Sequence, residues 1–309
     1  MSTISKSLFV AATLGVAILP YAAPAQAAGY TALYAFGDSL SDTGNAWLGS
    51  GQKTPLSPPY AAGRFSNGPV WVEDVARSLG LAQPTARALG GSNFAVGGAS
   101  TGAAPRPGGK PAPSDLPGQV TNFGKSVANI APPDGLYTLT IGANDVKFAV
   151  NASPDPAVQR TAALAAADAA AVAMNKLVAM GARHLLVANG PDLGQAPGGG
   201  FLSPLGRAAL TAAVNIYNAR LASGMALLAT ATGASISLLD VQGTLSGVVA
   251  APQRLGFENV TQSCLSKAAV PVPCAPTRAG QNLYLYWDGG HPTSHGHAVI
   301  AAQALTQLP

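Results

Sequence analysis

The stretch YTALYAFGDSLSD, residues 30–42, indicates the type of fold most directly, because an apolar run ends there in a glycine and a series of polar residues. Residues 30–36 lack the polar alternation of a half-exposed strand, so we expect a strand that is buried on both faces. Ser39 follows that strand almost directly. In parallel sheets, ligands bind beyond the carboxyl ends of the strands, and Ser39 lies at such an end.

The rest of the chain continues this alternation of buried strands and helices. Further apolar runs of strand character lie at residues 93–96, 135–141, 183–188 and 234–239. Segments with helical patterns lie between and after them, at residues 69–79, 116–130, 155–180, 203–230 and 294–305. The alternation predicts an α/β protein with a central parallel sheet that is covered by helices on both faces. We expect one domain, residues 28–309, whose long connecting segments are loops around a site.

Composition excludes several other classes of protein. The 309 residues are 48% apolar and 10% charged, whereas ordinary domains carry about 25% charged residues. Glycine and proline make up about a fifth of the chain, which is below the level of disordered or collagen-like proteins. No repeat indicates a solenoid or a coiled coil. The net charge of +4 comes from scattered residues, so the focused basic face of a nucleic-acid-binding protein is missing.

The first 27 residues have the layout of a secretory signal peptide. Lys6 precedes an apolar run at residues 8–19, and small residues around position 26 form a cleavage site that ends at Ala27. The run is shorter than the ~20 residues that a spanning helix needs. We therefore expect cleavage after Ala27, export to the periplasm or the medium, and no stable membrane span.

Two cysteines, Cys264 and Cys274, remain in the exported chain. Export to an oxidising compartment favours a disulfide between them, with two free thiols as the alternative. The bond would close the loop at residues 265–273. Two cysteines alone do not indicate a zinc site.

Three of the expected strand ends hold residues that suit acyl-transfer chemistry. Ser39 can act as a nucleophile, although serine is also a common helix N-cap. Gly97 and Gly98 follow the second expected strand, and paired glycines either aim a backbone N–H at an oxyanion or allow tight packing. Asn144 follows the third expected strand and offers either a side-chain N–H donor or a cap for a helix.

A fourth cluster, Asp288-Gly-Gly-His291, precedes the last expected helix. The spacing lets the carboxylate turn back onto the imidazole, which leaves the second ring nitrogen for a serine, as an acid–base relay requires. A surface loop is the alternative, but it does not explain this pair in a chain with four histidines. Together with Ser39, Gly98 and Asn144, the pair predicts a serine hydrolase.

These residues resemble the sequence blocks of the GDSL (SGNH) hydrolase family over nearly the whole chain after residue 27. The matching blocks are Gly37-Asp38-Ser39-Leu40, Gly98, Gly142-Ala143-Asn144-Asp145 and Asp288-x-x-His291. The segment Pro58-Pro59-Tyr60-Ala-Ala-Gly63-Arg64-Phe65-Ser66-Asn67-Gly68-Pro69-Val70-Trp71 resembles the secreted bacterial-type lipase/esterase branch. Some members of that branch carry a C-terminal β-barrel, and we expect none here because the chain ends soon after His291.

The resemblance implies a three-layer α/β/α sandwich with a central parallel sheet, the flavodoxin-like SGNH hydrolase fold, and ester hydrolysis without a metal or cofactor. It implies Ser39 as the nucleophile, His291 as the base and Asp288 as the residue that orients the base. It also implies an oxyanion hole that consists of the backbone N–H groups of Ser39 and Gly98 and the side chain of Asn144.

We therefore predict a secreted serine esterase or lipase that hydrolyses carboxylic esters through an acyl-enzyme. Its expected partner is a small-molecule or lipid ester, and the expected oligomeric state is a monomer. A carbohydrate acetylesterase or a phospholipid acylhydrolase on the same fold, and a non-catalytic secreted binding protein, are the alternatives. The sequence does not define the acyl chain or the alcohol of the substrate.

Two rival sites lie in the same sequence. Gly98-Ala-Ser100-Thr-Gly102 matches the G-x-S-x-G nucleophile elbow, but the prolines and glycines that follow are a poor start for the helix that this elbow needs. His291, His295 and His297 have a spacing that suits a metal site. Residues 294–297 are better explained as the opening turn of a helix.

The aromatic residues just before Asp288 have two interpretations. Tyr284, Tyr286 and Trp287 either line an apolar acyl pocket, which we favour, or fill the core. His184 precedes an expected strand, and we expect it to be structural.

Overall fold

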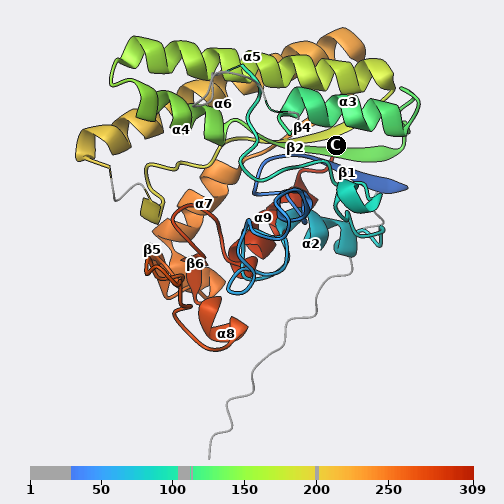
Figure 1. Ribbon diagram of the computed structural model, residues 1–309. Helices are drawn as coiled ribbons and strands as arrows, with labels where there is room; N and C mark the ends of the chain where they lie inside the picture. The colour runs from blue at the N-terminus through green and yellow to red at the C-terminus, as the bar shows by residue number, and fades with distance from the viewer. Residues whose placement is uncertain (1–28, 104–111, 113, 199–201) are drawn as a thin grey trace, which may run out of the picture.

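The computed structural model describes residues 29–103, 112, 114–198 and 202–309, so the predicted signal peptide lies outside the described residues. Four strands form a parallel sheet in the order β1-β2-β3-β4 (Figure 1). They are β1 (Ala32–Gly37), β2 (Gly135–Thr140), β3 (His184–Ala188) and β4 (Ser235–Leu239). The prediction of a parallel α/β sheet is confirmed, and these strands lie within two residues of their expected bounds.

Helices cover both faces of the sheet, which makes three layers (Figure 1). One face is covered by α3 (Leu116–Ser126), α4 (Ala143–Ala152), α5 (Pro156–Met180) and α6 (Pro204–Thr232). The other face is covered by α2 (Trp71–Ser78), α7 (Val241–Ala250) and α9 (Ser294–Thr306). The long helices α5 and α6 begin at prolines, whose fixed φ suits a first turn, and end at glycines in the left-handed region.

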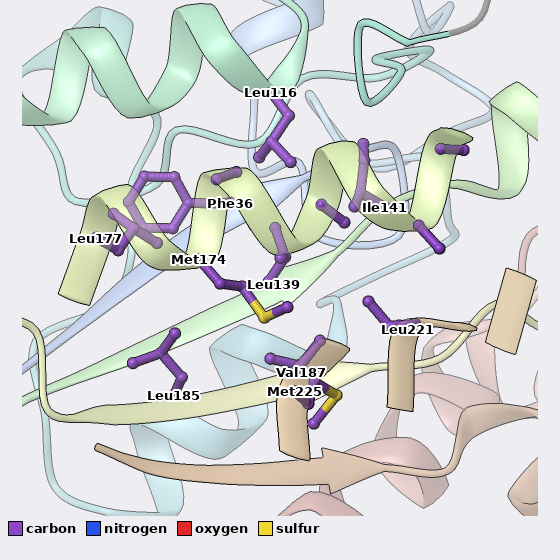
Figure 2. Close-up of a cluster of buried hydrophobic side chains, with 14 of the residues drawn as sticks. Phe36, Leu116, Leu139, Ile141, Met174, Leu177, Leu185, Val187, Leu221 and Met225 are labelled. Atoms are coloured by element: carbon purple, nitrogen blue, oxygen red, sulfur yellow. The ribbon is translucent and has the colours of Figure 1, made fainter. Parts of the chain in front are cut away.

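Neighbouring residues of each strand point to opposite faces of the sheet and fill two separate cores. Phe36 and Leu139 pack with residues of α3, α5 and α6, as Figure 2 shows around Met174. Ala35 and Leu186 pack with residues of α2, α7 and α9. Burial of each large apolar side chain stabilises the fold by ~1.5–3 kcal/mol. The strands are therefore apolar on both sides, which is the pattern that the sequence showed.

The prediction of a regular strand at residues 93–96 is wrong. The segment runs beside β1, where Phe94 N donates to Ala35 O at 2.7 Å and Val96 N donates to Gly37 O at 3.0 Å. Asn93 forms an isolated bridge to β1. Its side-chain oxygen accepts from the backbone of a residue two positions on, and this local turn takes the chain out of a regular ladder. The segment still occupies the edge outside β1, as the second strand does in flavodoxin-like sheets.

Two helices of the outer layers are not expected from the sequence pattern, and a third is shorter than expected. α4 and α7 begin two or three residues after the ends of their strands, so the apolar patterns of strand and helix run together. α3 ends at Ser126 although its pattern continues to residue 130, because Ala128 and Asn129 adopt positive φ values of 50° and 59°.

Several short elements lie in segments that we expected to be loops. Residues 252–290 contain a two-stranded parallel sheet, β5 (Asn259–Ser263) and β6 (Tyr284–Tyr286). Cys264 follows β5 and forms a disulfide with Cys274. The other short elements are α1 (Asn45–Gly49), α8 (Arg278–Gln281) and the 3-10 helices η1 (Arg87–Leu89) and η3 (Pro252–Leu255). Such elements are too short to show an apolar periodicity in the sequence.

Among the described residues, α5 alone is long and apolar enough to cross a membrane by length and composition. Its Ala163, Ala170 and Leu177 are buried in the core between the sheet and the helices that cover it. The helix also packs along α6. A core helix has the same apolar composition, so this packing accounts for it.

Gly37 ends β1 in a backbone conformation that a side chain would prevent. Its φ is +135°, and a Cβ atom there would lie 2.0 Å from the carbonyl oxygen of Thr140. The side-chain amide of Gln119 bonds both Gly37 N and Gly37 O at 2.8 Å. These contacts fix the strand end that precedes Ser39.

We expect Gly37→Ala to lower the free energy of unfolding by ~3 kcal/mol or more, because it combines a backbone clash with a strained φ. Thermal unfolding followed by circular dichroism measures the loss. Gly49→Ala is the matched control, since no atom lies within 4 Å of a Cβ at that position. Equal melting temperatures for the two variants would contradict this account of Gly37.

Candidate active site

Ser39 lies on the turn that leaves β1. Asp38 N donates to Thr140 O at 3.0 Å, and Leu40 N donates to Asp38 Oδ1 at 3.0 Å, so the turn is bonded both to β2 and to itself. The carboxylate of Asp42 accepts four backbone N–H groups, three of them from residues 44–46 at the start of the following helix. Asp42 therefore bonds the N–H groups that the N-cap interpretation assigned to Ser39, and Ser39 itself is half-buried.

Ser39, His291 and Asp288 form a chain of hydrogen bonds. Ser39 Oγ lies 2.7 Å from His291 Nε2, and His291 Nδ1 lies 2.7 Å from Asp288 Oδ2. A carboxylate can only accept, so Nδ1 is the protonated nitrogen and Nε2 is left to accept from the serine hydroxyl. The fold thus brings together the three residues that the sequence singled out.

The turn from Asp288 to His291 is held by its own backbone. Asp288 Oδ1 accepts from Gly290 N at 2.9 Å and from His291 N at 2.8 Å. Trp287 N donates to His291 O at 2.8 Å, which closes the turn. Because the turn follows β6, the small two-stranded sheet positions the aspartate and the histidine, whereas the central sheet positions the serine.

The charges around His291 act in opposite directions. Burial lowers the pKa of His291, but the charge and hydrogen bond of Asp288 outweigh burial and leave that pKa above its usual value. Burial raises the pKa of Asp288, yet the charge of His291 and the hydrogen bonds to the carboxylate hold it well below its usual value. Asp38 also raises the pKa of His291, and Lys147 lowers it. Asp38 is itself buried, and burial raises its pKa to about 6.

The predicted oxyanion donors come from three separate segments of the chain, at residues 39, 98 and 144. Asn144 is in the first turn of α4 and lines the same cavity as Ser39. It donates one amide hydrogen to Ala99 O at 2.8 Å, which fixes the side chain and leaves the second amide hydrogen. Gly97 N donates to the Asp42 carboxylate at 2.7 Å. The next residue, Gly98, has a φ of +77°, a conformation that favours glycine.

A cavity of about 380 Å³ adjoins Ser39 and His291. Its apolar lining includes Pro191, Leu193, Leu202 and Leu210. Helix α4 adds a polar stripe of Asn144, Lys147 and Asn151, whose spacing places them on one helix face. The cavity therefore suits an apolar chain that is joined to a polar group.

The rival serine, Ser100, does not have the surroundings of a nucleophile. It is fully buried, its backbone N–H donates to Asp115 Oδ1 at 2.8 Å, and its Oγ accepts from Gly102 N at 3.2 Å. Within the described ranges no histidine bonds to it, so the base that an elbow serine needs is missing.

The other histidines have structural surroundings. His295 Nδ1 lies 2.9 Å from Asn282 O, and its ring stacks on Phe257 with centroids 4.2 Å apart. His297 is fully buried, and burial lowers its pKa to about 3. In the part of the chain that the structure describes, no three His, Cys, Asp or Glu side chains are grouped as a metal ion would require.

The favoured interpretation of the aromatic residues before Asp288 is wrong. Tyr286 is buried in the core with α7 and α9, and Trp287 is fully buried against Cys264 and Leu265. Tyr284 packs on the same small cluster. None of the three lines the cavity.

The sequence analysis did not single out Tyr60 or Lys147. Tyr60 O–H donates to Asp288 Oδ2 at 2.7 Å, across a separation of 228 residues. Tyr60 belongs to the Pro-Pro-Tyr segment that resembles the lipase/esterase branch, and this was its sequence signal. Lys147 follows the Gly142–Asp145 block on the next turn of a helix that the sequence pattern did not predict.

A Ser–His–Asp relay at the carboxyl edge of a parallel sheet is the arrangement of serine hydrolases. The model of the GDSL-like lipase/acylhydrolase family matches residues 33–304, and the chain belongs to this family.

Several other proteins are similar to this chain over most of its length. The chain is 28% identical to the phosphatidylcholine-sterol acyltransferase of Aeromonas hydrophila, over 95% of this chain and 94% of that protein. It is 28% identical to a GDSL esterase/lipase of Arabidopsis thaliana, over 90% of this chain and 89% of that protein. The crystal structure of phospholipase A1 from Streptomyces albidoflavus superposes with a TM-score of 0.47 at 17% identity, covering 90% of this chain and 99% of that one.

We expect Asp288→Asn to bring the pKa of His291 below its usual value of ~6.5, because burial then acts without the charge of Asp288, which opposes it more strongly than Asp38 does. A titration of the histidine ring signals by NMR measures the change against the wild-type protein. Asp168→Asn is the control, since Asp168 is an exposed acid that pairs with Arg220 on the far helices. An unchanged His291 titration in Asp288→Asn would show that the carboxylate does not control this ring.

Proposed function

We propose that this protein is a serine esterase or lipase that hydrolyses carboxylic esters through an acyl-enzyme. The observation that supports the proposal most directly is the unbroken relay from Ser39 through His291 to Asp288, with both links at 2.7 Å, beside a cavity with an apolar lining. A binding protein has no need of a serine that is aligned with an imidazole and a buried carboxylate, so the non-catalytic alternative loses its support.

The proposed reaction has two acyl-transfer steps. His291 takes the hydroxyl proton as Ser39 Oγ attacks the ester carbonyl, and Asp288 stabilises the imidazolium that forms. The negative charge on the carbonyl oxygen is stabilised by the N–H groups of Ser39 and Gly98 and by the Asn144 amide. His291 then gives its proton to the leaving alcohol. Water repeats the sequence on the acyl-enzyme and releases the acid.

We expect Ser39→Ala to lower kcat on p-nitrophenyl butyrate by at least ~10³-fold with an unchanged melting temperature, because only the nucleophile is lost. Ser100→Ala is the matched control, since Ser100 is the other serine with a motif for catalysis. That variant should keep wild-type kcat unless its buried position lowers stability, which the melting temperature reports. Full activity of Ser39→Ala would refute the nucleophile assignment.

A phospholipid acylhydrolase is the second candidate, and Lys147 favours it. Lys147 is exposed, lines the cavity one helical turn from Asn144 and forms no ion pair within the part of the chain that the structure describes. An ester carbonyl at Asn144 would thus place a neighbouring phosphodiester close to the ammonium group. The similarity to a phosphatidylcholine-sterol acyltransferase also supports a phospholipid as the acyl donor.

We expect Lys147→Gln to lower kcat/KM roughly 5- to 10-fold on phosphatidylglycerol in mixed micelles, because one charged contact to the phosphate is lost. Hydrolysis of diacylglycerol in the same micelles should change by less than about twofold. Lys176→Gln on the exposed side of α5 is the control for general surface charge. Equal losses on both lipids, or no loss on either, would remove the case for a phospholipid and leave the esterase proposal intact.

We also propose that the chain is exported and loses residues 1–27. The support is the layout of this segment, with one lysine before a short apolar run and a small-residue site at Ala27. The disulfide between Cys264 and Cys274 is consistent with an oxidising compartment.

A further inference from the structure

Asp288 has a hydrogen-bond partner from a distant part of the chain. Asp288 Oδ2 lies 2.7 Å from His291 Nδ1 and also accepts from Tyr60 O–H at 2.7 Å. Its other oxygen is bonded to the backbone of its own turn. The oxygen that faces the histidine is therefore shared between the imidazole and a tyrosine that the two-step reaction does not use.

Tyr60 packs on Trp287, the residue that directly precedes Asp288. Its ring makes edge contacts with Trp287 and Phe65, at centroid distances of 6.1 and 6.4 Å. Leu265 N in turn donates to Trp287 O at 2.7 Å, next to the disulfide-bonded Cys264. The hydroxyl is thus fixed relative to the carboxylate by packing on both sides of the ring.

Tyr60 acts as a donor throughout the pH range of enzyme assays. Burial raises the pKa of Tyr60 far above its usual value, and the adjacent charge of Asp288 raises it further. A hydrogen bond to a carboxylate stabilises its charge and reduces the share of that charge that acts on a second partner. The tyrosine hydroxyl therefore reduces the electrostatic stabilisation that Asp288 gives to a protonated His291.

We propose that Tyr60 is a positioning residue of the active site, which fixes the Asp288 carboxylate and through it sets the basicity of His291. The proposal rests on the proposed esterase function, because it assigns a role within the same relay. The charged or titratable groups that act on His291 in this site are Asp288, Asp38, Lys147 and His297. The Tyr60 hydroxyl differs from all of them because it is neutral and is bonded to Asp288, not to the histidine ring.

The test is the pH profile of kcat/KM for Tyr60→Phe on p-nitrophenyl butyrate. The base must be neutral to accept the serine proton, so activity appears as pH rises through the pKa of His291. Loss of the hydroxyl leaves more of the Asp288 charge to the imidazolium, so this acid limb should move to higher pH, by about half a unit. We expect kcat at pH 8 to fall roughly 3- to 10-fold with KM unchanged, because a less fixed carboxylate orients the base less well.

Tyr284→Phe is the matched control. Tyr284 packs on the same cluster of Trp287 and Cys264, and in the described ranges its hydroxyl makes no hydrogen bond. This variant should keep both the acid limb and kcat. An acid limb that stays in place in Tyr60→Phe, with only a lower melting temperature, would show that Tyr60 is merely structural and would overturn the proposal.

A second substitution tests the sign of the effect without removing the ring. Placing 3-fluorotyrosine at position 60 makes the hydroxyl a stronger donor, so the acid limb should move to lower pH. A shift in the same direction as that of Tyr60→Phe would also overturn the proposal. Wild-type protein that hydrolyses no ester would contradict the proposed function instead, and the NMR titration of His291 in Tyr60→Phe would then test the inference on its own.

Discussion

The hydrogen bond between Ser39 Oγ and His291 Nε2 joins residues that are 252 positions apart, and the rest of the structure serves to keep it in place. An O–H···N contact of 2.7 Å tolerates little movement of either partner before it weakens. Both partners sit on short turns, which are the least rigid parts of most folds. The stiffness must therefore come from the elements on which the two turns are built.

The two turns are made rigid by different means. The serine turn follows β1, and its backbone is bonded to Thr140 of β2, to the Gln119 amide and to the carboxylate of Asp38. The histidine turn follows β6, outside the central sheet. A two-stranded sheet alone is marginally stable, and here the Cys264–Cys274 disulfide and buried Trp287 support it.

Buried charge is what gives the site its chemistry. Asp288 is stabilised as an anion by hydrogen bonds from its own turn, from His291 and from Tyr60. Without these donors, burial would favour the neutral acid, and no imidazolium could be stabilised. Asp38 and Lys147 act on the same ring with opposite signs. The basicity of His291 is thus a balance among groups that come from four separate segments of the chain.

The apolar runs of the sequence were enough to indicate the parallel α/β sheet, because strands that are buried on both faces have this pattern. The type and order of Ser39, Asp288 and His291 indicated a hydrolytic relay, and the fold brings these three residues together. The sequence could not reveal the irregular segment at residues 93–96, the inward position of Trp287 or the contact of Tyr60 with Asp288. These features depend on the side chains of segments that are distant in the sequence. A local sequence pattern does not indicate a contact between residues 228 positions apart, such as that of Tyr60 with Asp288. Only the tertiary structure, which fixes those neighbours by packing, decided them.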